Sequence, residues 1–84
     1  MVPLADMTVG SVALIRLLNG GHRLNARLAV LGFTPGAPVT VMRNHGMGPM
    51  IVSIRGVQIA LGRGEARQIL VHPADGHNPL VETD

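Results

Sequence analysis

The sequence predicts a mostly β fold: a small five-stranded barrel with one short α-helix between its first and second strands. Three observations support this class. The chain has 84 residues, of which 46% are hydrophobic, so it can build one compact core and one domain. From residue 38 onward, apolar and polar residues alternate with a period of two, as in half-buried strands. One earlier segment instead repeats leucine with helical spacing.

The first predicted strand spans residues 11–17 and follows a turn-like lead-in from Pro3 to Met7. The strand segment is rich in β-forming residues and almost entirely apolar. We therefore expect it to be covered on both sides. An Asn-Gly-Gly sequence at residues 19–21 ends it.

The predicted helix comes next and is about ten residues long. Leu24, Leu28 and Leu31 recur at i, i+4 and i+7, which places them on one helical face. Gly32 then provides a C-terminal stop. A Pro-Gly pair at residues 35–36 forces a turn before the next strand.

The remaining strands are short and separated by tight turns. A glycine-rich connection at residues 44–49 joins two of them as a hairpin, and Gly56 makes the next turn. A single helical turn at residues 63–66 precedes the last strand, in which Ile69 and Val71 are expected to point inward. These four strands are predicted at residues 38–42, 52–55, 58–61 and 68–71.

Five short strands, tight turns and one early helix describe an SH3-like barrel, which we assign to residues 1–72. Residues 73–84 contain two prolines and a glycine and show no periodicity. We expect this tail to be disordered.

The composition excludes several classes of protein. With no cysteine, the chain has no disulfide framework and no thiolate metal site. It lacks a secretory signal and an apolar run near the roughly 20 residues of a membrane span. We expect a soluble, cytoplasmic protein that meets a membrane only through a partner. Ser11 and Ser53 lie within strands without a histidine and an acid at a recognisable spacing, so no enzyme activity is expected.

Positive charge is concentrated in the predicted barrel. All seven arginines lie within residues 1–72, together with only two acids, Asp6 and Glu65, which leaves an excess of five positive charges. The other three acids lie in the tail, and the chain has no lysine. A basic body of this kind favours acidic partners.

Three segments of the sequence resemble the ferrous-iron transport protein A (FeoA) family. They are RLAVLGFTPG (residues 27–36), GMGPMIVSIRG (residues 46–56) and IALGRGEARQILV (residues 59–71). Their order and spacing extend the resemblance over residues 3–72.

The resemblance implies an accessory protein of ferrous-iron uptake. Proteins of this family are thought to act on the cytoplasmic, GTPase-bearing part of the ferrous-iron permease FeoB. We expect a monomer or weak oligomer that requires no cofactor, and no catalytic residue is carried over. Related modules form the C-terminal domain of some metal-dependent repressors, so a nucleic-acid-binding or repressor-type module is the alternative. Against a nucleic-acid partner, Phe33 is the one aromatic residue available for stacking on bases.

Four histidines are candidates for a metal site. A firm site needs three or four ligands that converge at fixed spacing, and none of the histidine pairs has the usual i, i+4 spacing on a helix. We interpret them as exposed histidines that can offer at most weak surface binding of a divalent ion such as iron or zinc. They are His22, His45, His72 and His77.

The predicted partner surface combines basic, turn and apolar residues. Arginines four apart on the helix can grip carboxylates through paired hydrogen bonds, or they can simply form a solvated face. The glycines and prolines can present exposed corners, or they can only end the helix and make turns. The candidates are Arg23, Arg27, Val30, Gly32, Pro35, Gly36, Met47, Gly48 and Pro49.

Two apolar residues near loops are assigned opposite roles. We expect Phe33 to complete the core, because no other aromatic residue can fill it. We expect Met47 to belong to an adaptable docking surface. The loop from Gly46 to Pro49 lacks the lysine and hydroxyl of a phosphate-binding loop and does not lead into a helix, so it is interpreted as a hairpin turn.

Overall fold

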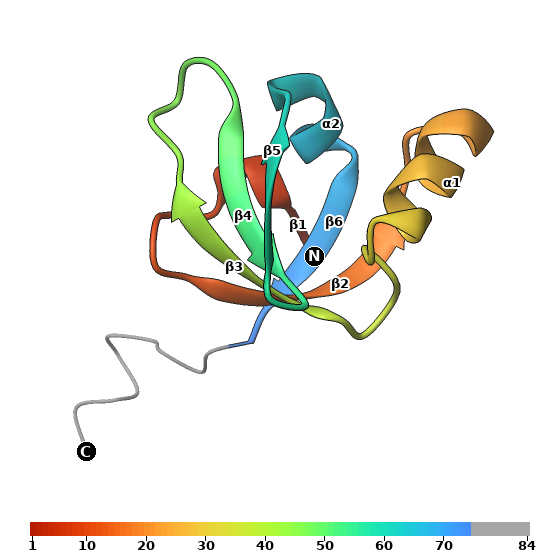
Figure 1. The fold of residues 1–84 in the computed structure, drawn as a ribbon, viewed down its shortest axis with the longest axis horizontal. Coiled ribbons are helices and arrows are strands. Elements are labelled where there is room, and N and C mark those ends of the chain that lie inside the picture. Colours follow the sequence, from red (N-terminus) through yellow and green to blue (C-terminus); the bar gives the residue numbers. More distant parts are fainter. Residues whose placement is uncertain (75–84) are drawn as a thin grey trace.

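A coiled antiparallel sheet forms the body of the protein in the computed structural model, which describes residues 1–74 (Figure 1). Within these residues the sheet has six strands in the order β1-β6-β2-β3-β4-β5. The two end strands, β1 and β5, are not paired with each other, so the barrel is open between them. The elements are β1 (Val2–Pro3), the 3-10 helix η1 (Leu4–Asp6), β2 (Val12–Leu18), α1 (His22–Val30), β3 (Pro38–Arg43), β4 (Met50–Ile54), β5 (Val57–Leu61), α2 (Arg63–Arg67) and β6 (Ile69–Pro73).

The predicted fold class is confirmed. The five expected strands are β2 to β6, and α1 lies between the first two of them. The period of two is visible in β4, where Met50, Val52 and Ile54 are buried and the two residues between them are partly exposed. In β6, Ile69 and Val71 are buried as expected.

The structure adds a sixth strand at the N-terminus, where the sequence indicates only a lead-in. Val2 pairs with Val71 and Pro3 pairs with Leu70 along β6. Two residues, one of them a proline, are too short to show any alternation, so the pattern does not reveal this strand. The strand directs Leu4 of η1 into the core, where it is fully buried.

The expectation that residues 11–17 are covered on both sides is wrong. Ala13 and Ile15 of β2 are buried, whereas Leu14 and Leu17 are exposed on the other face of the strand. The pairing register with β6 shifts between Ile15 and Leu17, which is the signature of a β-bulge at Arg16. An apolar run looks the same in the sequence whether one or both faces are covered, so periodicity cannot separate these cases.

Helix α1 ends as predicted at Gly32, and the geometry there is a Schellman motif. Gly32 has φ of 108°, a conformation that residues with a Cβ rarely adopt. Its N–H bonds the carbonyl oxygen of Ala29, and the N–H of Phe33 bonds that of Leu28, each at 3.0 Å. The chain then reverses through Pro35 and Gly36, closed by a 3.0 Å hydrogen bond from the Ala37 N–H to the Thr34 carbonyl.

The turn between β4 and β5 contains two residues with positive φ. Arg55 and Gly56 have φ of 52° and 81°, and they connect the pair formed by Ile54 and Val57. Two positive φ values in a two-residue connection are typical of a type I′ hairpin, whose twist matches that of the strands.

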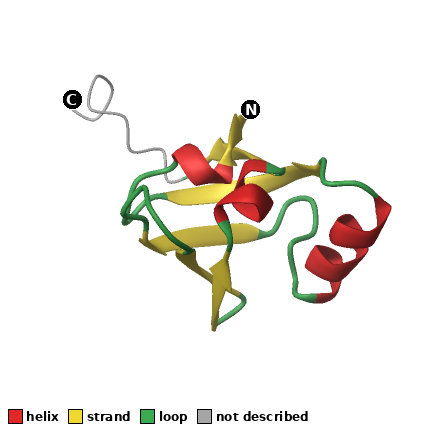
Figure 2. Ribbon diagram, turned by 90° about the horizontal axis from the view of Figure 1, so that it is seen from above, coloured by secondary structure: helices red, strands yellow, loops and turns green. Residues whose placement is uncertain are grey.

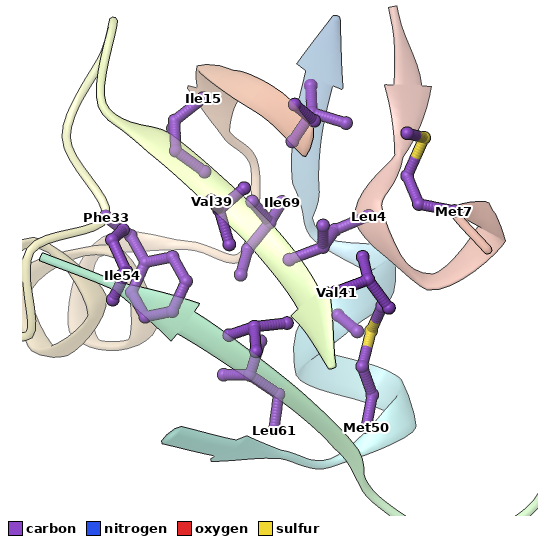
Figure 3. Close-up of a cluster of buried hydrophobic side chains, with 14 of the residues drawn as sticks. Leu4, Met7, Ile15, Phe33, Val39, Val41, Met50, Ile54, Leu61 and Ile69 are labelled. Atoms are coloured by element: carbon purple, nitrogen blue, oxygen red, sulfur yellow. The ribbon is translucent and has the colours of Figure 1, made fainter. Parts of the chain in front are cut away.

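The core is a single hydrophobic cluster enclosed by the coiled sheet (Figure 3). Phe33 lies at one end of the cluster and Met7 and Met50 lie at the other. Phe33 and Met50 are both fully buried. The expected core role of Phe33 is thus confirmed, and Met50, just before the predicted strand 52–55, is also a core residue at the start of β4.

The end of β6 extends slightly beyond the predicted domain boundary at residue 72. Pro73 pairs with Ala13, and the Ala74 N–H bonds the Val12 carbonyl at 2.8 Å. The remainder of the predicted tail, residues 75–84, lies outside the described residues. Among residues 1–74, no helix has the length and apolar character needed to cross a membrane.

Replacing the single aromatic core residue should destabilise the fold strongly. We expect Phe33→Ala to lower the free energy of unfolding by about 3–5 kcal/mol, because it leaves a cavity that a small core cannot refill. Urea denaturation followed by circular dichroism measures this. The control is Met47→Ala, at a side chain that is 83% exposed, which should change stability by less than about 0.5 kcal/mol. A loss below about 1 kcal/mol for Phe33→Ala would contradict the assigned role.

Candidate functional site

Helix α1 stands at one end of the molecule, beside the coiled sheet (Figures 1 and 2). Its attachment to β2 depends on the side chain of Asn25. The Oδ1 atom of Asn25 accepts a 2.9 Å hydrogen bond from the Gly20 N–H, and its Nδ2 atom donates at 3.1 Å to the Leu18 carbonyl. These bonds hold the start of the helix against the end of the strand.

A hollow of about 420 Å³ opens along this helix. We call it the α1 hollow, and it is lined by Gly20, Arg23, Leu24 and Arg27. Arg23 and Arg27 are four residues apart and therefore project from the same face of α1. The apolar side chain of Leu24 lines the same hollow as the two arginines, so the hollow suits a ligand that is partly apolar and partly anionic.

Gly20 leaves room for the side chain of Leu24 in the hollow. A Cβ built there would lie 2.3 Å from the Cδ2 atom of Leu24 and 3.3 Å from the Cβ of Gln68. A larger residue would push Leu24 away from its place. At Gly20 the constraint on a side chain is therefore steric, because the φ angle there is not in the left-handed region.

An ion pair joins α1 to α2. The Nη2 atom of Arg27 contacts the Oε2 atom of Glu65, and the side chain of Arg27 remains 60% exposed. The other carboxylate oxygen of Glu65 accepts a 2.9 Å hydrogen bond from the Gly62 N–H at the start of α2. Glu65 therefore has two structural roles, and the charge of Arg27 is partly neutralised.

Arg55 covers the C-terminal end of α1. Its aliphatic stem lies over Gly32, where a Cβ would be only 3.1 Å from the Arg55 Cδ. Its Nη2 atom donates a 3.2 Å hydrogen bond to the Thr34 hydroxyl. A cation at this position also complements the negative end of the helix dipole. Val30, the last residue of α1, is 86% exposed. It adds an apolar side chain to the helix that carries Arg23 and Arg27.

The charge around this end of the protein is strongly one-sided. Asp6 and Glu65 are the two acids within residues 1–74, and Glu65 already pairs with Arg27. Across the described residues, that is the one ion pair between side chains. Arg23 is exposed and has no carboxylate partner there. The α1 hollow can therefore accept a carboxylate without first breaking an existing ion pair at Arg23.

The predicted partner residues do not form one surface. Arg23, Arg27 and Val30 lie on α1, and residues 32–36 form the connection that follows it. The β3–β4 loop, which contains Met47, Gly48 and Pro49, lies at the opposite end of the molecule in both views (Figures 1 and 2). Gly32, Pro35 and Gly36 make the helix end and the turn described above, which supports their structural interpretation. A partner role for any of the nine residues stays a prediction.

The histidines do not converge. His22 begins α1, His45 lies in the β3–β4 loop and His72 lies on β6, and all three are exposed. Residues 1–74 contain no group of three or more histidine or carboxylate side chains placed to hold a metal ion. His77 lies outside the described residues.

A hydrogen-bond network that sequence reasoning missed holds the N-terminal segment in place. Asn44 donates through Nδ2 to the carbonyls of Ala5 and Met7, at 3.0 and 2.8 Å. Its Oδ1 atom accepts from Arg63 Nη1 at 2.8 Å, and Arg63 Nη2 donates to the Ala5 carbonyl at 3.2 Å. An asparagine directly after a strand is an ordinary turn residue, so no local signal indicates contacts 37 to 58 residues away in the chain.

Known proteins resemble this chain in sequence and in fold. The FeoA domain family matches residues 2–73. The Fe(2+) transport protein A of Methanocaldococcus jannaschii is 36% identical over 75 residues, which are 89% of this chain and 90% of that protein. A crystal structure of the iron uptake regulatory protein FeoA has a TM-score of 0.82 and 38% identity, covering 87% of this chain and 97% of the other.

One further solved structure concerns the fold alone. The zinc complex of FeoA from Stenotrophomonas maltophilia, described as a prokaryotic SH3 domain protein, has a TM-score of 0.77 and 24% identity. The match covers 84% of this chain and 89% of that chain. It agrees with the SH3-like architecture predicted from the order and length of the strands.

Removing the Asn44 side chain should destabilise the protein. We expect Asn44→Ala to lower the free energy of unfolding by about 1–3 kcal/mol, because it leaves the Met7 carbonyl without its side-chain donor and Arg63 Nη1 without its acceptor. Chemical denaturation gives the difference. The neighbouring exposed residue provides the control, since His45→Ala should have almost no effect. Equal stability of the two variants would show that the network is dispensable.

The Arg27–Glu65 pair should contribute little to stability by itself. A double-mutant cycle with Arg27→Ala and Glu65→Ala is expected to give a coupling energy of about 0.2–1 kcal/mol, because the pair is exposed and screened by salt. Glu65→Ala alone should cost more than Arg27→Ala, since it also removes the acceptor of the Gly62 N–H. The opposite order of the two single variants would contradict this account.

Proposed function

Because this chain belongs to the FeoA domain family, we propose that it is an accessory protein of ferrous-iron uptake that binds and modulates the cytoplasmic, GTPase-bearing part of the FeoB permease. The name of the M. jannaschii relative supports the link to ferrous-iron transport. The observation on which the binding role depends is the α1 hollow, where Arg23 has no carboxylate partner among residues 1–74.

The chemistry of the hollow favours an acidic protein surface with an apolar residue at its centre. A carboxylate can accept two parallel hydrogen bonds from a guanidinium group, which fixes its direction as well as its position. Leu24 offers an apolar side chain in the same lining. The excess of positive charge around the site would also steer an acidic partner toward it and speed association at low salt.

The structure argues against the alternative of single-stranded nucleic acid as the partner. Such proteins stack bases on exposed aromatic side chains. Phe33 is the only aromatic residue in the sequence, and it is fully buried. The arginines could contact phosphates, but no stacking surface accompanies them. An acidic protein partner therefore remains the better interpretation of the basic surface.

We also propose that the protein needs no resident metal ion. The histidines within residues 1–74 lie on separate elements, and each is exposed to solvent. A site that binds a divalent ion tightly requires several ligands held in fixed geometry. The protein would then regulate the movement of iron through contact with the permease rather than by holding iron.

A charge reversal in the hollow should weaken binding to the permease. We expect Arg23→Glu to raise the Kd for the isolated GTPase-bearing domain at least about tenfold, or about 1.4 kcal/mol, because repulsion replaces attraction. Isothermal titration calorimetry in GDP, in a GTP analogue and without nucleotide measures this. Arg43→Glu makes the same charge change at the end of β3 and should alter the Kd less than about threefold.

Two results would contradict this assignment in different ways. If Arg43→Glu weakens binding and Arg23→Glu does not, the partner uses the end of the molecule that contains the β3–β4 loop. If the unmodified protein binds in none of the three nucleotide states, the proposed partnership itself is wrong. Because Arg23 is exposed and unpaired, the Arg23→Glu protein should fold normally, which circular dichroism checks.

Divalent metal ions should bind weakly. We expect titration with Zn(II), or with Fe(II) under anaerobic conditions, to give dissociation constants above the micromolar range, with no change in His45→Ala. Exposed single histidines cannot supply the several ligands of a tight site. A submicromolar, one-to-one complex that disappears in His45→Ala would overturn this proposal.

A further inference from the structure

The edge of the sheet at β5 is open. The strand order ends at β5, which pairs along one side with β4 from Val57 opposite Ile54 to Leu61 opposite Met50. Within residues 1–74, no strand pairs with its other side. Figure 2 shows the β4–β5 hairpin projecting from the rest of the sheet, which leaves this side accessible.

The hairpin geometry identifies the backbone groups that are free at this edge. A two-residue turn closes on a hydrogen-bonded pair, here Ile54 and Val57, and hydrogen-bonded and non-hydrogen-bonded pairs then alternate along an antiparallel ladder. Gln58 and Ala60 fall on the non-hydrogen-bonded positions. Their N–H and C=O groups therefore point away from β4, and both residues are exposed.

The β5 edge lacks the features that usually prevent strand addition. Proteins protect edge strands with proline, charge, a bulge or very short length. The other edge strand, β1, has two residues and ends in Pro3. By contrast, the β5 sequence Val-Gln-Ile-Ala-Leu has five residues with no charge and no proline, and its pairing with β4 is regular.

The charges at the two ends of β5 oppose pairing with a second copy of the chain. Arg55 precedes the strand and Arg63 follows it. In an antiparallel pair of β5 strands, bonding between Gln58 of one copy and Ala60 of the other sets the register. That register brings the Arg55 end of one strand near the Arg63 end of the other, and like charges brought close together repel each other.

We propose that the β5 edge binds an extended segment of an acidic partner, which adds a strand to the sheet. The segment would have about five uncharged residues, matching a strand of roughly 17 Å, with Asp or Glu at each end. Backbone hydrogen bonds to Gln58 and Ala60 provide the affinity, and the flanking arginines select acidic ends. Arg55 donates to the Thr34 hydroxyl, and Arg63 donates to Asn44 and to the Ala5 carbonyl. All of these partners are neutral and neither arginine has a carboxylate partner within residues 1–74, so both keep a positive charge that attracts acidic ends. This surface is separate from the α1 hollow, so the inference does not depend on the proposed binding to the permease.

A capped synthetic peptide tests the inference. The peptide has five alternating threonine and valine residues between pairs of glutamates, and it is titrated into the full-length ¹⁵N-labelled protein. We expect saturable shifts of the β5 amide resonances, and hydrogen exchange at the Gln58 and Ala60 amides should slow at least about tenfold. A peptide with lysine in place of glutamate should bind at least about tenfold more weakly, because its charge opposes the arginines.

Two matched changes separate strand addition from other binding. Ala60→Pro removes the outward N–H but no ladder bond to β4, so it should abolish binding, whereas Gln58→Ala keeps its backbone groups and should bind normally. If Ala60→Pro does not fold, a peptide that is N-methylated at alternate residues makes the same comparison on the unmodified protein, and its binding should be lost.

Four outcomes would overturn the inference. The first is no protection of the Gln58 and Ala60 amides at millimolar peptide. The second is equal binding of the glutamate and lysine peptides. The third is protection of these amides in the protein alone that disappears on dilution, which would show that a second copy occupies the edge. Shifts confined to Arg23 and Arg27 would place the peptide in the α1 hollow and would likewise contradict strand addition.

Discussion

The backbone reversal at Gly32 determines the position of every functional candidate near α1. A left-handed residue at this point lets the chain close two hydrogen bonds onto the last turn of the helix and then directs Phe33 into the core. Burial of this one aromatic side chain holds the end of α1 against the barrel. Because Gly32 has no Cβ, the stem of Arg55 can also lie across the same point. A residue with a side chain there would disturb the helix end, the core and the β4–β5 turn together.

The charged side chains lie outside the hydrophobic core. All the buried residues are apolar within the described part of the chain, and the arginines lie at its surface or in partly buried hydrogen-bond networks. Arg63 is used to fasten the N-terminal segment, and Arg27 fastens α1 to α2. Arg23 has neither role. Because Arg23 makes no ion pair within residues 1–74, it can attract an acidic partner without the loss of a contact that the fold uses.

The two proposed binding surfaces would use different kinds of recognition on one small domain. The α1 hollow offers side chains, and its selectivity depends on the fork geometry of guanidinium groups around an apolar floor. The β5 edge offers backbone groups, and its selectivity depends on the length and end charges of an added strand. Both surfaces favour acidic partners because seven arginines share the domain with only two acids. Their separation means that one partner could engage both, or that two partners could bind independently.

The sequence by itself determined most of the elements and part of the core. Helical leucine spacing followed by glycine located α1, and period-two alternation located β3, β4 and β6, because local backbone geometry dictates which side chains share a face. The two-residue strand β1 escaped detection because it is too short for any period, and the exposed face of β2 escaped because an apolar run does not reveal what covers it. The candidate residues on α1 could be named from their spacing. Only the tertiary structure decided that Glu65 pairs with Arg27, that Asn44 fastens the N-terminal segment, and that the β3–β4 loop lies at the opposite end of the molecule from α1. Those relations join residues distant in the chain, and no local pattern records which of them folding brings together.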